Sequence, residues 1–257
     1  MASATEPKVS TITAVSSLSA PVDIQRLFDH LNLAEGSDEG VVRIECGNEF
    51  NERATRGEDP RPPSMSRRRR TTSKRLFRNQ TTALIRTKYG GDDTVGYINA
   101  KVFASGNLQM TGVKDVAQGR RAGDLLVRAI RSSKPTAGIV ADVAALHHDS
   151  SKYRVCLIKC DFKVDMQIRR DLLFDLVVRT SPGVRCTFEP CVYPGVKINL
   201  PCGNVTISCF RSGCVIVTGA KTMQEVADAR AFLVAFLATH RSSVEHFEPP
   251  RRTLISA

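Results

Sequence analysis

Long apolar runs, zinc-type cysteine pairs and the common catalytic constellations are missing from this sequence of 257 residues. Without a run of about 18 apolar residues, we expect no membrane-spanning helix. The opening residues also lack the basic and apolar segments of a secretory signal. The eight cysteines form no CxxC pair and have no histidine at zinc spacing, which favours reduced intracellular thiols over disulfides or a metal site. With no Ser-His-Asp set and no glycine-rich phosphate loop, we predict a protein that is not an enzyme and needs no cofactor or metal.

Positive charge, in contrast, is abundant. The 37 lysines and arginines outnumber the 26 acidic residues, which gives a net charge of +11 and a sequence pI of about 9.5. Such an excess favours an anionic partner, with nucleic acid as the first candidate. Much of it lies in residues 48–76, a proline-rich and polar stretch with the run RRRR. We predict a disordered or mobile loop there.

One sequence motif of twelve residues occurs twice. FASGNLQMTGVK at 103–114 and FRSGCVIVTGAK at 210–221 share Phe, Ser-Gly, Thr-Gly and Lys at identical offsets. A repeat on this scale indicates two related halves rather than one unrepeated core.

Apolar periodicity gives both halves the same order of elements. In the second half we predict helices at 167–180 and 222–240 and strands at 154–162, 184–193, 196–200, 205–212 and 214–220. In the first half we predict helices at 20–31 and 115–133 and strands at 9–15, 40–47, 81–89, 96–105 and 107–112. The fold class is therefore α+β: two tandem β-α-β-β-β-β-α half-repeats that form one saddle-shaped, curved antiparallel sheet with the helices on its convex face.

The domain organisation follows from these elements. We expect a first half-repeat at 1–133, which contains the insertion at 48–76, a linker at 134–152, a second half-repeat at 153–241 and a tail at 242–257. The concave face of the sheet is left open, and an open sheet face in a basic protein needs a partner.

The doubled FxSGxxxxTGxK phrase, followed each time by a helix, resembles the core of the TATA-box-binding protein family. FEPCVYPGVKI at 188–198 is similar to that family's Tyr-Glu-Pro-Glu-Leu-Phe-Pro-Gly-Leu-Ile run, and KCDFKV at 159–164 is similar to its Ser-Cys-Asp-Val-Lys. The resemblance covers most of 154–240 and, more loosely, 9–33 and 80–131. Details such as FRNQTTALIRT at 77–87 look like the diverged members encoded by large nucleocytoplasmic DNA viruses.

The resemblance implies that the concave sheet lies on the DNA minor groove and that aromatic rings wedge between base steps and kink the duplex. Tyr193 and Phe210 would form one wedge. Phe103 and Phe77 would form the other, with Phe50 as the competitor of Phe77. The positions that carry over to this sequence as DNA contacts are Phe77, Phe103, Thr111, Leu157, Tyr193, Pro194, Phe210, Ile216 and Thr218.

Two departures from the family pattern bear on the DNA sequence that is read. The family's two groove-facing asparagines fall at Thr11 and Val155, and valine cannot form a hydrogen bond with a base edge. Tyrosine replaces a wedge phenylalanine at position 193, and its hydroxyl weakens insertion between bases. We therefore predict A·T-rich or deformable DNA with an altered consensus.

Two further sets of residues have competing interpretations. The basic residues of the insertion would contact DNA phosphates, serve as a nuclear import signal or belong to a solvated loop; they are Arg67, Arg68, Arg69, Arg70, Lys74 and Arg75. Glu189 matches a family residue contacted by transcription factor IIB, and a solvated turn glutamate is the equal alternative.

The leading hypothesis is a transcription initiation factor that bends promoter DNA and recruits a transcription-factor-IIB-like partner and RNA polymerase. One alternative is an architectural DNA- or RNA-binding protein without promoter preference. Another is an enzyme-associated module, which has no chain length left for a catalytic domain. We expect the nucleus or a viral replication compartment as the location, with packaging in the virion left open.

Overall fold

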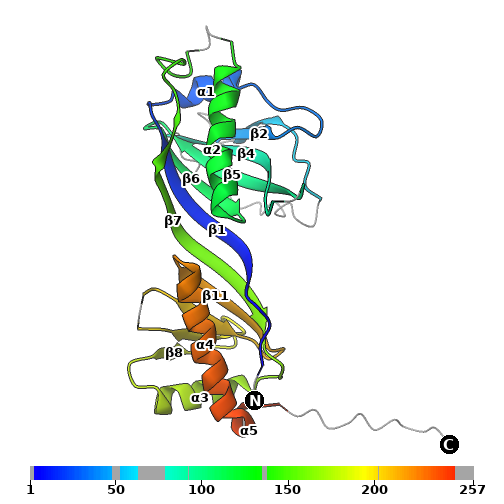
Figure 1. Ribbon diagram of the computed structural model, residues 1–257, viewed down its shortest axis with the longest axis vertical. Coiled ribbons are helices and arrows are strands. Elements are labelled where there is room, and N and C mark those ends of the chain that lie inside the picture. The colour runs from blue at the N-terminus through cyan, green and yellow to red at the C-terminus, as the bar shows by residue number, and fades with distance from the viewer. Residues whose placement is uncertain are drawn as a thin grey trace, which may run out of the picture. The chain divides into compact units, whose positions relative to one another are not determined.

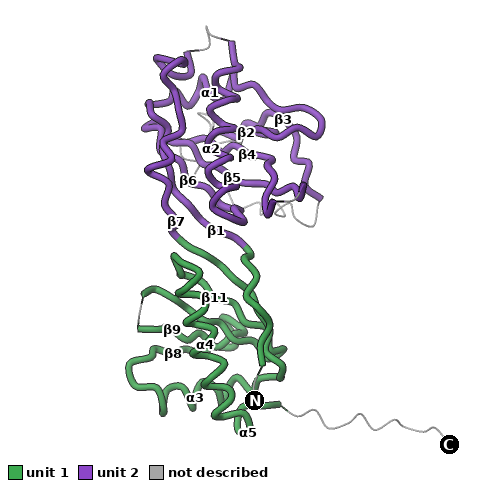
Figure 2. Tube along the Cα trace, viewed as in Figure 1, with its two compact units in different colours: residues 1–10, 157–257 green, residues 11–156 purple. Residues whose placement is uncertain are grey.

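The computed structural model describes residues 3–47, 53–62, 79–91, 93–134, 138–201 and 203–246. They belong to two compact units (Figure 2): unit 2 is residues 11–156, and unit 1 is residues 1–10 together with 157–257. Among these described residues, no helix is both long and apolar enough to cross a membrane.

Unit 2 is an antiparallel sheet with two helices; Figure 1 labels its elements except β3, which Figure 2 labels. Its elements are β1 (Lys8–Leu18), α1 (Ile24–His30), β2 (Gly40–Gly47), β3 (Arg53–Gly57), β4 (Gln80–Lys88), β5 (Val95–Phe103), β6 (Asn107–Val113), α2 (Val116–Arg131) and the first part of β7 (His148–Lys163). The strands are ordered β3-β2-β4-β5-β6-β1-β7. Helix α2 begins at the N-cap Asp115, whose carboxylate accepts a hydrogen bond from the Gln118 amide. It buries Leu126 and Ile130 over β2, β4 and β6, which makes the core.

Unit 1 repeats this plan without a counterpart of β3. Its elements after β7 are α3 (Arg170–Thr180), β8 (Arg185–Thr187), β9 (Val196–Asn199), β10 (Thr206–Cys209), β11 (Cys214–Ala220), α4 (Met223–Thr239) and α5 (Arg241–Val244). Its strands are ordered β7-β11-β10-β9-β8, with α4 packed on β11 and α3 on β8 and β9. The N-terminal residues belong here, because the Thr5 amide bonds to the Lys163 carbonyl and Arg230 donates to the Ala4 carbonyl at 2.8 Å.

The backbone geometry of both units explains why the second glycine of the repeated motif is required. Gly112 and Gly219 have φ angles of +93° and +90°, a backbone region that other residues rarely adopt. A Cβ atom at Gly112 would lie 2.7 Å from the Tyr97 carbonyl oxygen, and one at Gly219 would lie 1.9 Å from the Asn204 carbonyl oxygen. Each unit therefore needs glycine at this position of the repeated motif.

The predicted helices and strands are confirmed in both halves, with four differences. Helix α5 (Arg241–Val244) runs into the stretch predicted as a tail at 242–257. Part of the stretch predicted as a loop at 48–76 forms β3, which pairs with the outer edge of β2. Arg56 anchors it by donating to the Phe28 and Leu31 carbonyls at the end of α1. Strand β7 begins at His148, inside the segment predicted as a linker. Strand β8 is only three residues long, because residues 188–193 form a turn.

Candidate nucleic-acid interface

In each unit, the sheet has one face that carries the helices and one that does not. In β11, Val215 and Val217 are buried against the helices, so Ile216 and Thr218 lie on the opposite face. Across the strands, Ile216 pairs with Ser208 and Thr218 with Thr206. We call this side the uncovered face of unit 1. By the same alternation it includes Leu157, Lys159, Asp161, Arg185, Thr187, Lys197, Asn199, Thr206, Ser208, Ile216 and Thr218.

Two aromatic rings stand together at one end of this face. Phe210 follows β10 and Tyr193 precedes β9, and their ring centroids lie 5.8 Å apart with an interplanar angle of 61°. Both half-buried rings rest on Gly195: a Cβ atom there would lie 2.9 Å from the Tyr193 ring and 3.1 Å from the Phe210 ring. The sequence predicted these two rings as a pair, and the structure brings them together in the edge-to-face arrangement that aromatic pairs prefer.

A lysine that the sequence reasoning missed lies beside the pair. The Lys197 ammonium is 4.4 Å from the centroid of the Tyr193 ring, within the range of a cation–π contact. Lys197 is exposed and belongs to the uncovered face, so it places a positive charge next to the rings. The signal in the sequence was its position two residues after Gly195 in an alternating strand.

The turn before Tyr193 carries the other two predicted residues of this region. Glu189 is exposed, and its carbonyl accepts hydrogen bonds from the Val192 and Tyr193 amides at 2.9 Å each. Pro194 is exposed, and its carbonyl accepts a bond from the Arg170 guanidinium. Both residues thus shape the turn that positions the Tyr193 ring, while the Glu189 side chain remains on the surface.

The uncovered face of unit 2 follows the same plan. Phe103 is the last residue of β5 and is half-buried, and Thr111 is exposed between Asn99 and Thr13. By strand alternation the face includes Thr13, Val15, Tyr97, Asn99, Lys101, Phe103, Gln109 and Thr111. Phe103 and Thr111 therefore hold the same positions in this unit that Phe210 and Thr218 hold in unit 1.

The two positions predicted to replace the family asparagines lie on the long strands. Thr11 is half-buried, and its hydroxyl accepts a bond from the Gly112 amide at 3.0 Å, beside a register shift between β1 and β6. Val155 and Leu157 are half-buried residues of β7, and Leu157 lies on the side opposite the buried Ile158. The Thr11 hydroxyl thus has a backbone partner, and Val155 offers no hydrogen-bonding group.

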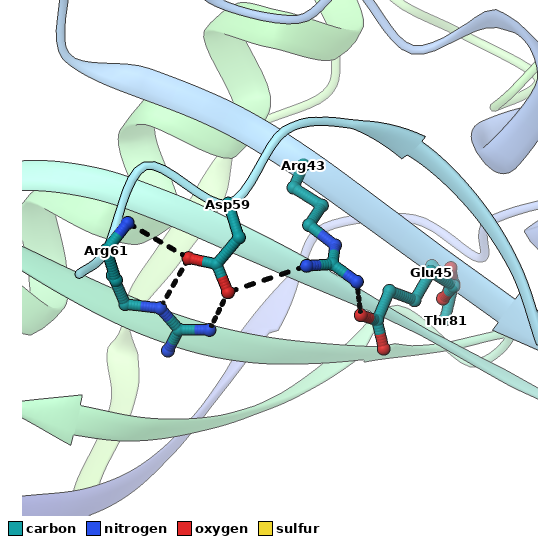
Figure 3. Close-up of polar contacts among 5 residues, drawn as sticks. All are labelled: Arg43, Glu45, Asp59, Arg61 and Thr81. Carbon is teal, nitrogen blue, oxygen red and sulfur yellow. Dashed lines mark hydrogen bonds and ion pairs between the residues drawn. The ribbon is translucent and has the colours of Figure 1, made fainter. Parts of the chain in front are cut away.

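Another segment of the chain covers the outer part of the uncovered face of unit 2. After β3 the chain crosses over it, and Asp59 bonds there to Arg61, with distances of 2.7 and 2.6 Å to the two carboxylate oxygens (Figure 3). Arg43 of β2 lies between Asp59 at 3.4 Å and Glu45 at 2.5 Å. Leu84, which pairs with Arg43 across the strands, is only 3% exposed. Residues 58–62 therefore cover part of the face.

The two arginines and two carboxylates of this cluster balance each other's charge. The hydrogen bonds from Arg61 hold the pKa of the Asp59 carboxyl below its usual range, with a smaller contribution from Arg43. The paired side chains are between 14% and 25% exposed, so water screens them only in part. The cluster fixes residues 58–62 in place as long as Asp59 is ionised.

Several predicted residues lie outside the described residues. They are the wedge candidates Phe77 and Phe50 and the basic residues Arg67, Arg68, Arg69, Arg70, Lys74 and Arg75. Their roles stay predictions.

The structure also brings together a Ser-His-Asp set that the sequence reasoning did not find. Ser16 Oγ lies 2.6 Å from His148 Nε2, and His148 Nδ1 lies 3.2 Å from an Asp124 carboxylate oxygen. The His148 side chain is 0% exposed and packs where a Cβ atom on Gly123 would be 2.6 Å from its ring. Because Ser16 is also buried, no substrate reaches its hydroxyl. The set ties β1 and β7 to α2.

Comparisons with known proteins agree with the repeated plan. A family model described as "Transcription factor TFIID (or TATA-binding protein, TBP)" matches residues 155–240. A "TATA-box-binding protein-like" protein of Acanthamoeba polyphaga mimivirus is 27% identical over 258 residues, which cover 93% of this chain and 66% of that protein. "TATA-box-binding protein 2" of Entamoeba histolytica is 25% identical over 143 residues, 55% of this chain and 59% of that protein. The chain thus spans less than two thirds of the length of these relatives.

A solved structure gives the fold class. The TBP of Methanococcus jannaschii superposes with a TM-score of 0.52 at 13% sequence identity, and the match covers 91% of this chain and 99% of that one. The fold is therefore the α+β fold of two tandem half-repeats that the sequence predicted. The family model on the second half and the viral relative along most of the chain make this protein similar to the TATA-box-binding protein family. The matched family model is described as a transcription factor.

Proposed function

We propose that this protein is a TATA-box-binding-protein-like transcription initiation factor that binds the minor groove of promoter DNA through its uncovered faces. The observation that carries the proposal is the Tyr193–Phe210 pair on Gly195, at the end of the uncovered face of unit 1. Two adjacent rings at the edge of a binding face can enter a base step and unstack it, which kinks the duplex. Phe103 holds the matching position in unit 2.

The rest of the uncovered face of unit 1 suits a minor groove. Ile216 and Leu157 are half-buried apolar side chains that can replace groove water, and Thr218 and Asn199 offer hydrogen-bonding groups of short reach. The minor groove presents few distinguishing acceptors, so such a face reads mainly A·T against G·C and the ease of deformation. Lys197 is placed to meet a phosphate near the rings.

The residues at the family's two asparagine positions support a weaker selection of particular base pairs. The Thr11 hydroxyl is engaged with the Gly112 amide, and Val155 carries no polar group. We infer that the protein selects A·T-rich or deformable DNA with a consensus of its own. The basic residues of the insertion would add phosphate contacts, each of which steepens the dependence of log affinity on log salt by about 0.9.

The partners and location follow from this role. A transcription-factor-IIB-like protein would approach the exposed Glu189 and its turn, and an RNA polymerase would be recruited through it, in the nucleus or in a viral replication compartment. Because Cys191 stands where the family has a second glutamate, we expect this contact to differ from that of other members.

A bending experiment tests the proposal. Duplexes that carry a donor and an acceptor dye at their ends, one A·T-rich and one G·C-rich, are titrated with the protein, with Phe210→Ala and with Phe232→Ala. Phe232 is a half-buried ring on α4, so its substitution removes the same atoms away from the uncovered face. We expect energy transfer to rise for the A·T-rich duplex, and Phe210→Ala to weaken binding about tenfold, since each base–aromatic stack contributes roughly 1–3 kcal/mol.

Other outcomes would contradict the promoter role. Binding without a change in energy transfer, or tighter binding of single strands, would favour the architectural DNA- or RNA-binding alternative. Equal losses from Phe210→Ala and Phe232→Ala would show that the rings of the uncovered face have no special part.

A further inference from the structure

Unit 1 has a pocket on the side of its sheet that carries the helices. The cavity has a volume of about 330 Å³ and lies between the first turn of α3, the turn after β8, the turn after β10 and the residues after α5. Its lining residues are Ile168, Arg169, Arg170, Asp171, Phe188, Pro190, Arg211 and His246. We call it the α3 pocket. A volume of this size accommodates one or two side chains rather than a folded domain.

The charge of the α3 pocket is mostly positive. Three arginines line it and a single acidic residue, Asp171, opposes them. Arg170 is held in place, because its guanidinium lies 5.3 Å from the centroid of the Phe188 ring and donates to the Pro194 carbonyl. Arg211 lies 3.1 Å from His246 Nε2. Two of the three cations therefore have ordered positions on the pocket wall.

The start of α3 adds to this positive potential. The helix has eleven residues, and its N-cap residue Arg169 makes no side-chain hydrogen bond to the first turn. The first backbone N–H groups of a helix have no partner within the helix and carry a partial positive charge. The exposed Arg169 side chain stands at this same end. An anion in the α3 pocket would meet both.

The pocket faces away from the side we propose for DNA. In β8, Thr187 pairs with Lys197 on the uncovered face, whereas Cys186 pairs with the buried Ile198. Phe188 continues on the side of Cys186, and its ring lies under Arg170 of α3. A duplex on the uncovered face therefore does not reach the pocket, and its ligand must be a different anion.

We propose that the α3 pocket binds a carboxylate-bearing segment of a partner protein. An aspartate or glutamate side chain would bind to Arg169, Arg211 and the first turn of α3, and a neighbouring apolar side chain would pack on Phe188 and Pro190. The apolar wall favours a peptide over a bare phosphate, and Asp171 repels a dianion more strongly than a single carboxylate. This inference stands independently of DNA binding by the uncovered face.

A peptide titration tests the assignment. The probe is a short fluorescein-labelled peptide that alternates Glu and Leu, and its reference is the same peptide with Gln in place of Glu. By fluorescence anisotropy we expect the Glu peptide to bind at least about tenfold more tightly, and Arg169→Gln to remove about tenfold, since hydrogen bonds to charged groups contribute about 1.5–3 kcal/mol. Arg128→Gln, an exposed arginine of α2 in the other unit, loses the same charge and should bind like the wild-type protein.

The position of the peptide is read by NMR, and circular dichroism checks that both variants fold. We expect the Phe188 ring and the Ile168 methyl signals to shift on addition of the Glu peptide. Equal losses from Arg169→Gln and Arg128→Gln, or no shift at Phe188 and Ile168, would overturn the assignment as diffuse charge attraction. If Arg169→Gln instead weakens duplex binding and the peptide does not bind, the pocket is a phosphate contact. The bending assay with Phe210→Ala judges the proposed function separately.

Discussion

Substitution of Asp59 by asparagine should release residues 58–62 from the uncovered face of unit 2. The carboxylate binds the Arg61 guanidinium with both oxygens, at 2.7 and 2.6 Å, and lies 3.4 Å from Arg43. Asp59 is only 14% exposed, so solvent screens these contacts in part. Asparagine has nearly the same shape but carries no charge and keeps only one acceptor oxygen.

The size of the effect follows from the number of bonds. Hydrogen bonds to charged groups contribute about 1.5–3 kcal/mol each, and asparagine retains part of one, so we expect local opening to become easier by about 2 kcal/mol. At 1.4 kcal/mol for each factor of ten, this is roughly a thirtyfold rise in the open population.

Amide hydrogen exchange measures that population directly. The Arg61 amide donates to Asp59 Oδ1 at 3.1 Å, so its exchange rate should rise about thirtyfold in Asp59→Asn. Asp93→Asn is the matched control, because Asp93 pairs with Lys88 at the surface and is 93% exposed; its exchange at Arg61 should not change. Unchanged exchange at Arg61 in a folded Asp59→Asn variant would refute the reasoning.

Three further predictions concern stability. Because Arg61 lowers the pKa of Asp59, the ionised Asp59 carboxylate stabilises unit 2 at pH values above the ordinary pKa of aspartate. In urea unfolding, this stabilisation should be lost as the pH falls below about 4, and the loss should be smaller in Asp59→Asn. Gly123→Ala should destabilise unit 2 in urea by about 1–3 kcal/mol, because the clash with the enclosed His148 ring outweighs the better helix propensity of alanine; a gain in stability would contradict it. Arg230→Gln should speed proteolysis at residues 3–6, because Arg230 holds the Ala4 and Thr5 carbonyls, and an unchanged cleavage rate would count against that contact.

Much of the fold could be predicted because the local signals agree with the tertiary arrangement. In α2 and α4 the apolar stripes, the Asp115 and Thr222 caps and the preceding glycine kinks all point to the same boundaries. Strand β3 could not be predicted, since RATRG has almost no apolar residues and its stability comes from pairing with β2 and from Arg56 on α1. His148 lies in the stretch that the sequence predicts as a linker, but Gly123 on another element makes room for its ring.

The candidate site divides in the same way. Tyr193 and Phe210 were paired through the resemblance to the TATA-box-binding protein family, and in the structure both rings pack on Gly195. Lys197 follows from alternation once β9 is known. The burial of Leu84 by residues 58–62 could not be predicted. It depends on ion pairs between β2 and the segment after β3, and the sequence of β3 has no alternation of apolar and polar residues.

The central claim is that Phe210 enters a base step. A duplex with 2-aminopurine at successive positions of an A·T-rich site reports base unstacking as a rise in fluorescence. We predict a rise at one step when the protein binds, its loss with Phe210→Ala and its retention with Phe232→Ala. Tight binding with no rise at any position would contradict the account.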